Sequence, residues 1–327
     1  MELEKQFTEV IQLIKEARYK ALKVVNTELI DLYWQVGEYI SKRISAEKWG
    51  KSVVQKLAKY IEKREPDIKG FSDKNLWRMK QLYETYKDFP ELSPLLREIS
   101  WTNNLIILSG AKSIEEKEFY LKLCIQEGYG KRELERQITS SLFERVMLGK
   151  QKLSPAVREL NGNGTHTFKD SYVFEFLNLP EVHNEDQLQK ALISQMKNFI
   201  LELGKDFLFM EEEYRLQVGN NDFWIDLLFY HRELQCLVAF ELKAGKFKPE
   251  FLGQLNFYLE ALDRDVKKKN ENPSMGVLLC KYKDDEVVEY ALSRNLSPAL
   301  IAAYQTQLPD KKLLKNKLHD IFENSHK

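Results

Sequence analysis

The sequence predicts a two-domain α+β chain, with an all-α domain over residues 1–160 and an α/β domain over residues 161–327. Three observations support this division. The length of 327 residues exceeds that of a typical single domain. Apolar residues recur every three to four positions in the first half, whereas strand-like runs occur only after residue 165. Between the halves, Asn161-Gly-Asn-Gly-Thr165 is rich in residues that favour turns, which is typical of a linker.

The first domain is predicted to be helical throughout. Residues 7–25 form one apolar stripe on a first helix, and residues 28–45 repeat that pattern on a second helix. Trp49-Gly50 marks a turn, and a third helix ends before Pro66. Ser72 is predicted to cap the next helix. Further helices are expected over residues 101–109, 115–126 and 131–148.

The second domain is predicted to have the order αβββαβ with a mixed sheet. Its first three strands are joined by short turns, so the sheet is not a doubly wound parallel one. Gly204 is placed to end the first helix. The expected elements are a helix over 187–204, strands over 207–218, 222–231 and 236–244, a helix over 249–263, a strand over 276–280, a helix over 285–294 and a strand over 299–304.

Composition limits the classes of function. Lys+Arg and Asp+Glu number 50 each, so any contact with nucleic acid must rest on a local cluster of charge. The three cysteines, Cys124, Cys236 and Cys280, lie far apart without a C-x-x-C pair, which favours a reducing compartment. The charged first residues are unlike a signal peptide, and no apolar run approaches membrane length. We therefore expect a cytoplasmic protein with no membrane partner.

Three charged residues lie inside two apolar strands that form a predicted hairpin. If its turn is centred between Glu233 and Leu234, residues whose numbers sum to 467 face each other. Asp226 then lies opposite Glu241, and Lys243 shares the face of Glu241 because strand side chains alternate. One face of the sheet therefore gathers two carboxylates and a lysine.

Two interpretations of these charges compete. Charges on strands usually lie on a solvated face, where a carboxylate and a lysine form a modest surface pair. Here the flanking runs are nearly continuous in apolar residues, which predicts a sheet that is covered on both faces. Buried charges of this kind need compensation, and a divalent cation between two carboxylates would provide it. Oxygen ligands without nearby His or Cys favour Mg²⁺ or Mn²⁺ over zinc.

The same residues resemble a known family. Asp226 lies fifteen residues before Glu241-Leu242-Lys243, a spacing that resembles the PD-(D/E)XK nucleases. The blocks at 225–231, 240–243 and 253–259, followed by the apolar run 276–280, look more specifically like the YhcG-like family. The helical half is similar to the domain that precedes the nuclease in that family, in Trp49-Gly50, residues 70–76 and Ser100-Trp101. The resemblance covers nearly the whole chain and implies a restriction-endonuclease-like fold for the second domain.

The resemblance implies roles for individual residues. Asp226, Glu241 and the backbone carbonyl of Leu242 would ligate Mg²⁺ (or Mn²⁺), and Lys243 would orient the attacking water or stabilise the charged phosphate. Gln254, on the following helix, would hydrogen-bond the water or a phosphate oxygen, and Tyr258 lies one turn further on the same face. His231 is expected to be structural or solvated.

The chain departs from the family pattern at one position. Nucleases of this fold usually add an acidic residue from the first helix of the core, where this chain has Gln189. Glu185 and Asp186 lie about one turn earlier and could substitute. The resemblance therefore implies a metal-dependent DNA endonuclease, acting on branched or foreign DNA in repair or defence. The alternative is a catalytically impaired nuclease-like module that binds DNA or protein. The sequence contains no P-loop motif G-x-x-x-x-G-K-[ST], no H-E-x-x-H and no G-x-S-x-G, so other enzyme classes find little support.

The helix that begins after Ser72 is a candidate DNA-binding element. Lys74, Asn75 and Arg78 lie near its start, as in the recognition helix of a helix-turn-helix unit. A solvated helix face with Leu76 in the core, or a domain devoted to protein contacts, remains open. Cuts in both strands of a duplex would favour a homodimer.

Overall fold

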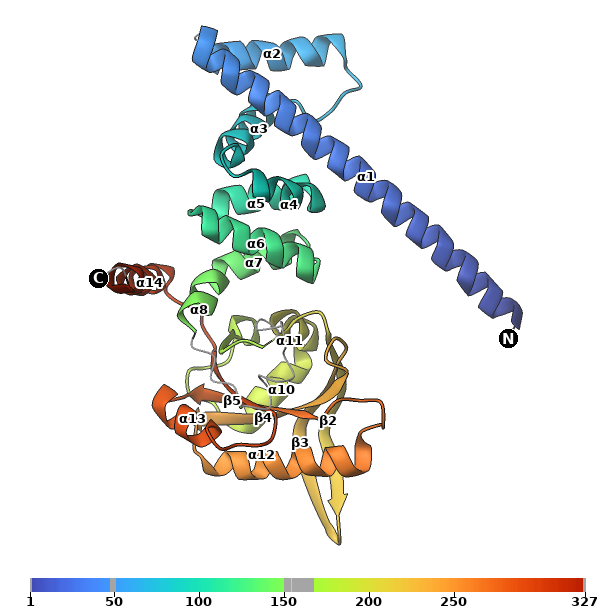
Figure 1. Ribbon diagram of the computed structural model, residues 1–327, viewed down its shortest axis with the longest axis vertical. Helices are drawn as coiled ribbons and strands as arrows, with labels where there is room; N and C mark the ends of the chain where they lie inside the picture. The colour runs from blue at the N-terminus through green and yellow to red at the C-terminus, as the bar shows by residue number, and fades with distance from the viewer. Residues whose placement is uncertain (1, 48–50, 150–153, 155–167, 326–327) are drawn as a thin grey trace. The chain divides into compact units, whose positions relative to one another are not determined.

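The computed structural model describes residues 2–47, 51–149, 154 and 168–325 (Figure 1). The chain divides into two compact units, Met1–Ile138, hereafter the helical unit, and Thr139–Lys327, hereafter the sheet unit. The division lies before the linker expected at residues 161–165, and that linker falls outside the described residues. Residues 142–148 belong to the sheet unit, where Arg145 donates a hydrogen bond to Glu202 at 3.3 Å.

The described part of the helical unit contains helices and no strand, as the sequence predicts. Serine caps begin several of the helices: Ser72 accepts from the Asn75 amide at 3.3 Å, and Ser100 accepts from the Asn103 amide at 3.2 Å. Gly128 ends another helix with a left-handed φ of 65°. The elements are α1 (Glu2–Glu47), α2 (Lys51–Arg64), α3 (Asp73–Tyr86), η1 (Pro90–Leu92), α4 (Ser93–Glu98), α5 (Trp101–Gly110), α6 (Ile114–Glu127) and α7 (Lys131–Thr139).

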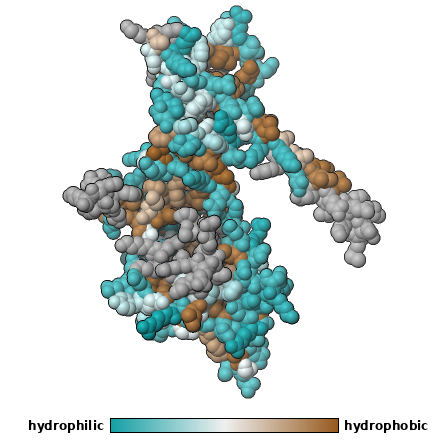
Figure 2. Space-filling view, in the orientation of Figure 1, coloured by the Kyte–Doolittle hydropathy of each residue, from teal (hydrophilic) through white to brown (hydrophobic). Residues whose placement is uncertain are grey.

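The prediction of two helices before residue 47 is wrong, because α1 is one continuous helix of 46 residues. The Asn26 side-chain amide donates to the backbone carbonyls of Arg97 and Ile99, which ties the middle of α1 to the end of α4. Apolar residues nearer the start of α1 are more than half exposed, as the brown patch on this helix in Figure 2 shows: Val10, Ile11, Ile14, Leu22 and Val25.

A second predicted helix, over residues 131–148, is divided in two. The break follows α7, and Ser141 adopts a left-handed φ of 56° before α8 (Leu142–Leu148) begins. A non-glycine residue in this region of φ interrupts helical geometry. The sequence gives no proline or glycine signal at this point.

The sheet unit contains a mixed six-stranded sheet in the order β1-β6-β5-β4-β3-β2. Strands β1, β6, β5 and β4 run parallel, whereas the β2, β3 and β4 neighbours pair antiparallel. The elements after α8 are β1 (Ser171–Val173), η2 (Glu175–Leu177), α10 (Glu185–Ser194), α11 (Met196–Leu203), β2 (Phe207–Val218), β3 (Asn221–His231), β4 (Cys236–Lys246), α12 (Glu250–Ala261), η3 (Leu262–Val266), β5 (Met275–Tyr282), α13 (Asp285–Leu292), β6 (Ala299–Gln305) and α14 (Lys311–Ser325).

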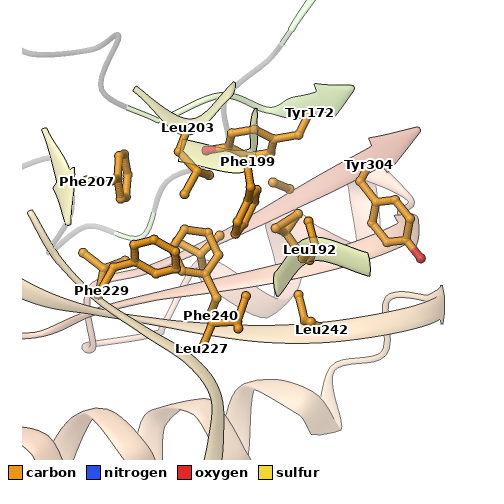
Figure 3. Packing of buried hydrophobic residues seen from close by; sticks show 14 of the residues in the cluster. Tyr172, Leu192, Phe199, Leu203, Phe207, Leu227, Phe229, Phe240, Leu242 and Tyr304 are labelled. Carbon is orange, nitrogen blue, oxygen red and sulfur yellow. The ribbon is translucent and has the colours of Figure 1, made fainter. Parts of the chain in front are cut away.

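Both faces of strands β4, β5 and β6 are covered, as their apolar sequences predict, whereas the edge strand β2 is largely exposed. One buried cluster joins Phe229 and Phe240 of the sheet to Leu192 of α10 and Phe199 of α11 (Figure 3). A second cluster joins the opposite face to α12 and α13. Gly276 lets α12 pack close, since a Cβ there would lie 2.5 Å from the Leu255 side chain. Charged side chains on these covered strands therefore lack ready access to water.

The predicted order αβββαβ is confirmed in the sheet unit, with three differences. The helix expected over 187–204 is interrupted at Gln195, where α10 ends and α11 follows. Strand β1 and helix α14 were not predicted. Strand β1 has only three residues, which is too short for alternation to be visible in a sequence.

Candidate active site

The β3–β4 hairpin has the register that the sequence predicts. Leu227 pairs with Phe240 and His231 with Cys236, so paired numbers sum to 467, and Asp226 and Glu241 follow directly after the last of these pairs. There a side chain bridges the strands: Asp226 Oδ2 accepts the Leu242 amide N–H at 2.7 Å. This charge-assisted bond holds the half-buried carboxylate against β4.

Glu241 and Lys243 lie beside Asp226 on β4. The Glu241 side chain is 2% exposed and that of Lys243 is 12% exposed, and Lys243 Nζ lies 3.5 Å from Glu241 Oε2. Glu241 Oε1 is buried without a hydrogen-bond partner. An ionised carboxylate in this position is costly, so the orphaned oxygen indicates a missing partner.

The surroundings alter the protonation of all three groups. Burial raises the pKa of Glu241 to about 8, and the nearby charge of Asp226 adds to the rise. Burial also raises the pKa of Asp226, although the Leu242 N–H and Lys243 act in the opposite direction. Burial disfavours the Lys243 ammonium, but the charges of Glu241, Glu185 and Asp226 outweigh that cost and raise its pKa. In the absence of a cation, a lysine ammonium is the counter-charge for several carboxylates.

Helix α10 brings two of the predicted accessory residues to the site. Gln189 Nε2 donates to the backbone carbonyl of Asp226 at 3.2 Å. Glu185 lies at the first turn of the same helix, and its Oε2 is 3.6 Å from Lys243 Nζ. The side chain of Glu185 is 51% exposed. The amide at position 189 therefore supports the strand, while the carboxylate one turn earlier reaches the charged cluster.

Helix α12 brings Gln254 and Tyr258. Gln254 Nε2 donates to the Tyr258 hydroxyl at 2.7 Å. The pKa of Tyr258 is raised by burial and by the charges of Glu241 and Asp226, which places its hydroxyl within their field. His231 is buried, and its Nδ1 accepts a hydrogen bond from the Leu234 N–H at 3.1 Å. The Nδ1 atom therefore carries no proton, and the hydrogen bond stabilises the turn between β3 and β4.

A further carboxylate, Glu213, was not predicted as a site residue. Strand β2 pairs Glu212 with Leu227 and Tyr214 with Ile225, so Glu213 lies opposite Asp226. The hairpin arithmetic would have found it, because paired residues on either side of this row sum to 439. We use the name carboxylate row for Glu213 on β2, Asp226 on β3 and Glu241 on β4.

The residues fit a hard divalent cation by charge and by chemistry. Their donors are carboxylate oxygens, which Mg²⁺ and Mn²⁺ prefer, and Glu241 Oε1 is an unused acceptor. Within the described residues no three His, Cys, Asp or Glu side chains converge closely enough to hold an ion. The ammonium of Lys243 lies between Glu241 and Glu185 and supplies a positive charge beside these carboxylates.

The predicted DNA-binding residues lie on α3 in the helical unit. Lys74 is exposed and Arg78 is partly buried. Asn75 is engaged within the fold: its Nδ2 donates to the Gly70 carbonyl at 2.5 Å, and its Oδ1 accepts from Trp101 Nε1 at 3.0 Å. The amide of Asn75 is therefore used by the fold itself.

Comparison with known proteins identifies the family of the chain. Residues 165–319 match the profile of the YhcG PDDEXK nuclease domain, and residues 9–145 match the DUF1016 N-terminal domain. The chain is 31% identical over 347 residues to the "Putative nuclease YhcG" of Escherichia coli (strain K12), covering 94% of this chain and 92% of that protein. The chain belongs to the YhcG-like family of PD-(D/E)XK nucleases. The predicted family and the restriction-endonuclease-like fold are thereby confirmed.

Solved structures show more distant likenesses to this YhcG-like chain. A repair endonuclease from Pyrococcus abyssi matches with a TM-score of 0.27 and 14% identity, covering 38% of this chain and 50% of that chain. The EndoMS–dsDNA2 complex matches with a TM-score of 0.24 and 17% identity, covering 36% of this chain and 46% of that chain. Both likenesses are too slight to carry an argument. Among the described residues, no helix is long and apolar enough to cross a membrane.

Proposed function

We propose that this chain is a metal-dependent DNA endonuclease that hydrolyses phosphodiester bonds at the site formed by Asp226, Glu241 and Lys243. The observation that carries the proposal is the buried Glu241 carboxylate, with an unpaired oxygen beside a second carboxylate and a lysine. A strand with both faces covered rarely keeps such charges for stability alone.

Each residue has a distinct part in this proposal. Asp226, Glu241 and the Leu242 carbonyl would hold Mg²⁺ or Mn²⁺, which when bound polarises a phosphate oxygen and lowers the pKa of water. The Leu242 N–H fixes the Asp226 carboxylate, and Gln189 fixes the Asp226 backbone. Glu185 supplies the carboxylate that Gln189 lacks.

Lys243 is the charged donor of the site. Its ammonium lies 3.5 Å from Glu241 and 3.6 Å from Glu185, and its aliphatic stem keeps it largely buried. On release from these carboxylates it would donate to the phosphate, whose charge grows in the transition state. Gln254, already paired with Tyr258, would donate to a phosphate oxygen or to the attacking water.

The substrate in this proposal is duplex or branched DNA, in repair or in defence against foreign DNA. Lys74 and Arg78 of α3 would contact the phosphate backbone through local positive charge. Two copies of the chain would cut both strands of a duplex.

The test is cleavage of a supercoiled plasmid and of a four-way junction with Mg²⁺, Mn²⁺ or EDTA. We expect cutting that needs the metal and is lost in Asp226→Ala. The matched control is Asp222→Ala, on the same strand, because Asp222 forms an exposed pair with Arg215. Full activity of Asp226→Ala would refute the proposed site. Bound but uncut DNA under every condition would support the catalytically impaired alternative, in which Gln189 marks the lost acid.

A further inference from the structure

Glu213 occupies an unusual place in the β2–β3 hairpin. It lies opposite Asp226, and Asp226 in turn lies in the row of Glu241, so three adjacent strands each present a carboxylate at one level of the sheet. A strand position directly opposite a like charge is unfavourable unless something neutralises the pair.

The backbone is distorted at the same level in both strands. Glu213 has a left-handed φ of 49°. On β3, Ile225 and Leu228 both pack in the cluster under α12, whereas Leu227 packs in the cluster under α10 and α11. Regular alternation would place Ile225 with Leu227, so the alternation of faces breaks at Asp226. Glycine or asparagine adopts this left-handed backbone conformation with less conformational strain than glutamate does, so Glu213 destabilises the strand relative to either residue.

Negatively charged side chains outnumber positively charged ones around the carboxylate row. Glu213, opposite Asp226 on β2, and Glu185 on α10 both add negative charge beside the Asp226 carboxylate. The Lys243 ammonium interacts with three carboxylates, Glu241, Glu185 and Asp226, while Glu213 adds a fourth negative charge beside Asp226. The independent sign of a ligand is the 98% buried Glu241, whose Oε1 has no partner.

We propose that Glu213 is a further carboxylate of the cation site. Asp226 and Glu241 would hold the divalent cation from β3 and β4, and the exposed Glu213 side chain on β2, which does not converge with them among the described residues, would turn toward the bound ion. The inference rests on the proposed function, since it names an additional residue of the same site. The occupant is a hard divalent cation such as Mg²⁺ or Mn²⁺, because the donors are all carboxylate oxygens. Glu213 is the exposed member of the carboxylate row, whereas Asp226 is half-buried and Glu241 is buried.

The test is a titration of the full-length protein with Mn²⁺ alone, in which electron paramagnetic resonance measures the free ion. The variants are Glu213→Gln, which keeps the shape and removes the charge, and Glu213→Gly, which relieves the left-handed backbone. Glu212→Gln is the matched control, because it removes an equal, exposed charge from the adjacent residue. Glu241→Gln reports on the site itself, and circular dichroism confirms that each variant is folded.

We expect Mn²⁺ affinity to fall by about tenfold in both Glu213 variants and to stay within about twofold of the wild type in Glu212→Gln. Equal affinities in Glu213→Gln and Glu212→Gln, with binding lost in Glu241→Gln, would overturn this inference and leave the proposed function standing. Weak binding in Glu213→Gln but wild-type binding in Glu213→Gly would also overturn it, because the carboxylate would then be dispensable. Failure of the wild type to bind Mn²⁺, or unaltered binding in Glu241→Gln, would overturn both proposals together.

Discussion

The carboxylate row of the sheet unit and the first turn of α3 in the helical unit both place polar side chains next to apolar ones, but they differ in how those groups are satisfied. In the row, Glu241 is buried with an unpaired oxygen. At the start of α3, Asn75 uses both ends of its amide within the fold, on Gly70 and Trp101. A satisfied polar group stabilises the fold, whereas an unsatisfied buried charge indicates a ligand.

The largest expected effect is the loss of DNA cleavage when the charge of Lys243 is removed. Lys243→Met keeps the length of the side chain and removes its charge, so plasmid cleavage should fall by about 10²- to 10³-fold, the loss typical of one charged or oxyanion-stabilising donor. Mn²⁺ binding should persist, because the competing ammonium is gone. Lys246→Met is the control, since Lys246 lies on the same strand and is exposed. Equal cleavage rates for both variants would show that Lys243 takes no part in catalysis.

The next effect is on stability as a function of pH. Glu241 has a folded-state pKa of about 8 against an ordinary value of 4.5, so the folded protein holds this proton more tightly than the unfolded chain. Its contribution to metal-free stability is full below pH 4.5 and is lost as the pH rises toward 8. Relative to the wild type, Glu241→Gln should therefore gain stability over this window, by a few kcal/mol at most, since one pKa unit is worth about 1.4 kcal/mol.

Urea unfolding at pH 5, 6.5 and 8 in the presence of EDTA measures this difference. The same difference in unfolding free energy between Glu241→Gln and the wild type at all three values of pH would show that the carboxylate is not strained by burial.

Removing the Asn75 side chain at the start of α3 should cause a smaller change in stability. Asn75→Ala should destabilise the helical unit by about 1–2 kcal/mol, because it leaves the Gly70 carbonyl and the Trp101 indole N–H without their partner. Lys74→Ala should change stability by less than about 0.5 kcal/mol. If the helical unit binds DNA, Lys74→Ala should reduce the salt slope of binding by about one. An Asn75→Ala variant of unchanged stability and weakened DNA binding would reverse these assignments.

The smallest expected effect is that of Gln189→Ala. The variant loses one hydrogen bond to the Asp226 backbone carbonyl, and Glu185 remains in place. Cleavage should therefore fall only several-fold, by about tenfold at most, which corresponds to ~1.4 kcal/mol. A larger loss than that of Glu185→Gln, measured in the same assay, would make Gln189 the dominant contribution of α10.

The elements with strong periodicity were predictable from the sequence, and so was the register of the β3–β4 hairpin as far as Leu227 and Phe240. Apolar strands between short turns have few alternative pairings. The bounds predicted for β2 are also the observed ones, although most of its side chains are exposed. The continuity of α1 was not predictable, because the amide of Asn26 contacts residues 97 and 99, which are distant in the sequence. Local patterns cannot reveal such tertiary partners.

Site residues were predictable where a charged residue stands among apolar neighbours in a strand. They were not predictable where a charged residue belongs to a run of polar residues. Asp226, Glu241 and Lys243 stand out among hydrophobic neighbours. Glu213 follows two other glutamates on an exposed edge strand, so only the register of the Gly219-Asn220 turn distinguishes it. The left-handed backbone at Glu213 depends on the packing of two strands and leaves no mark in the sequence.

Thermal unfolding at pH 8 with and without Mg²⁺ tests directly whether Asp226 and Glu241 hold a cation. Saturating Mg²⁺ should raise the Tm of the wild type by about 5 °C or more, since a ligand at 100 times its Kd contributes ~2.7 kcal/mol. Glu241→Gln should melt above the wild type without metal and should gain nothing from Mg²⁺. An equal rise in Tm for both proteins, or none for the wild type, would show that these carboxylates hold no cation.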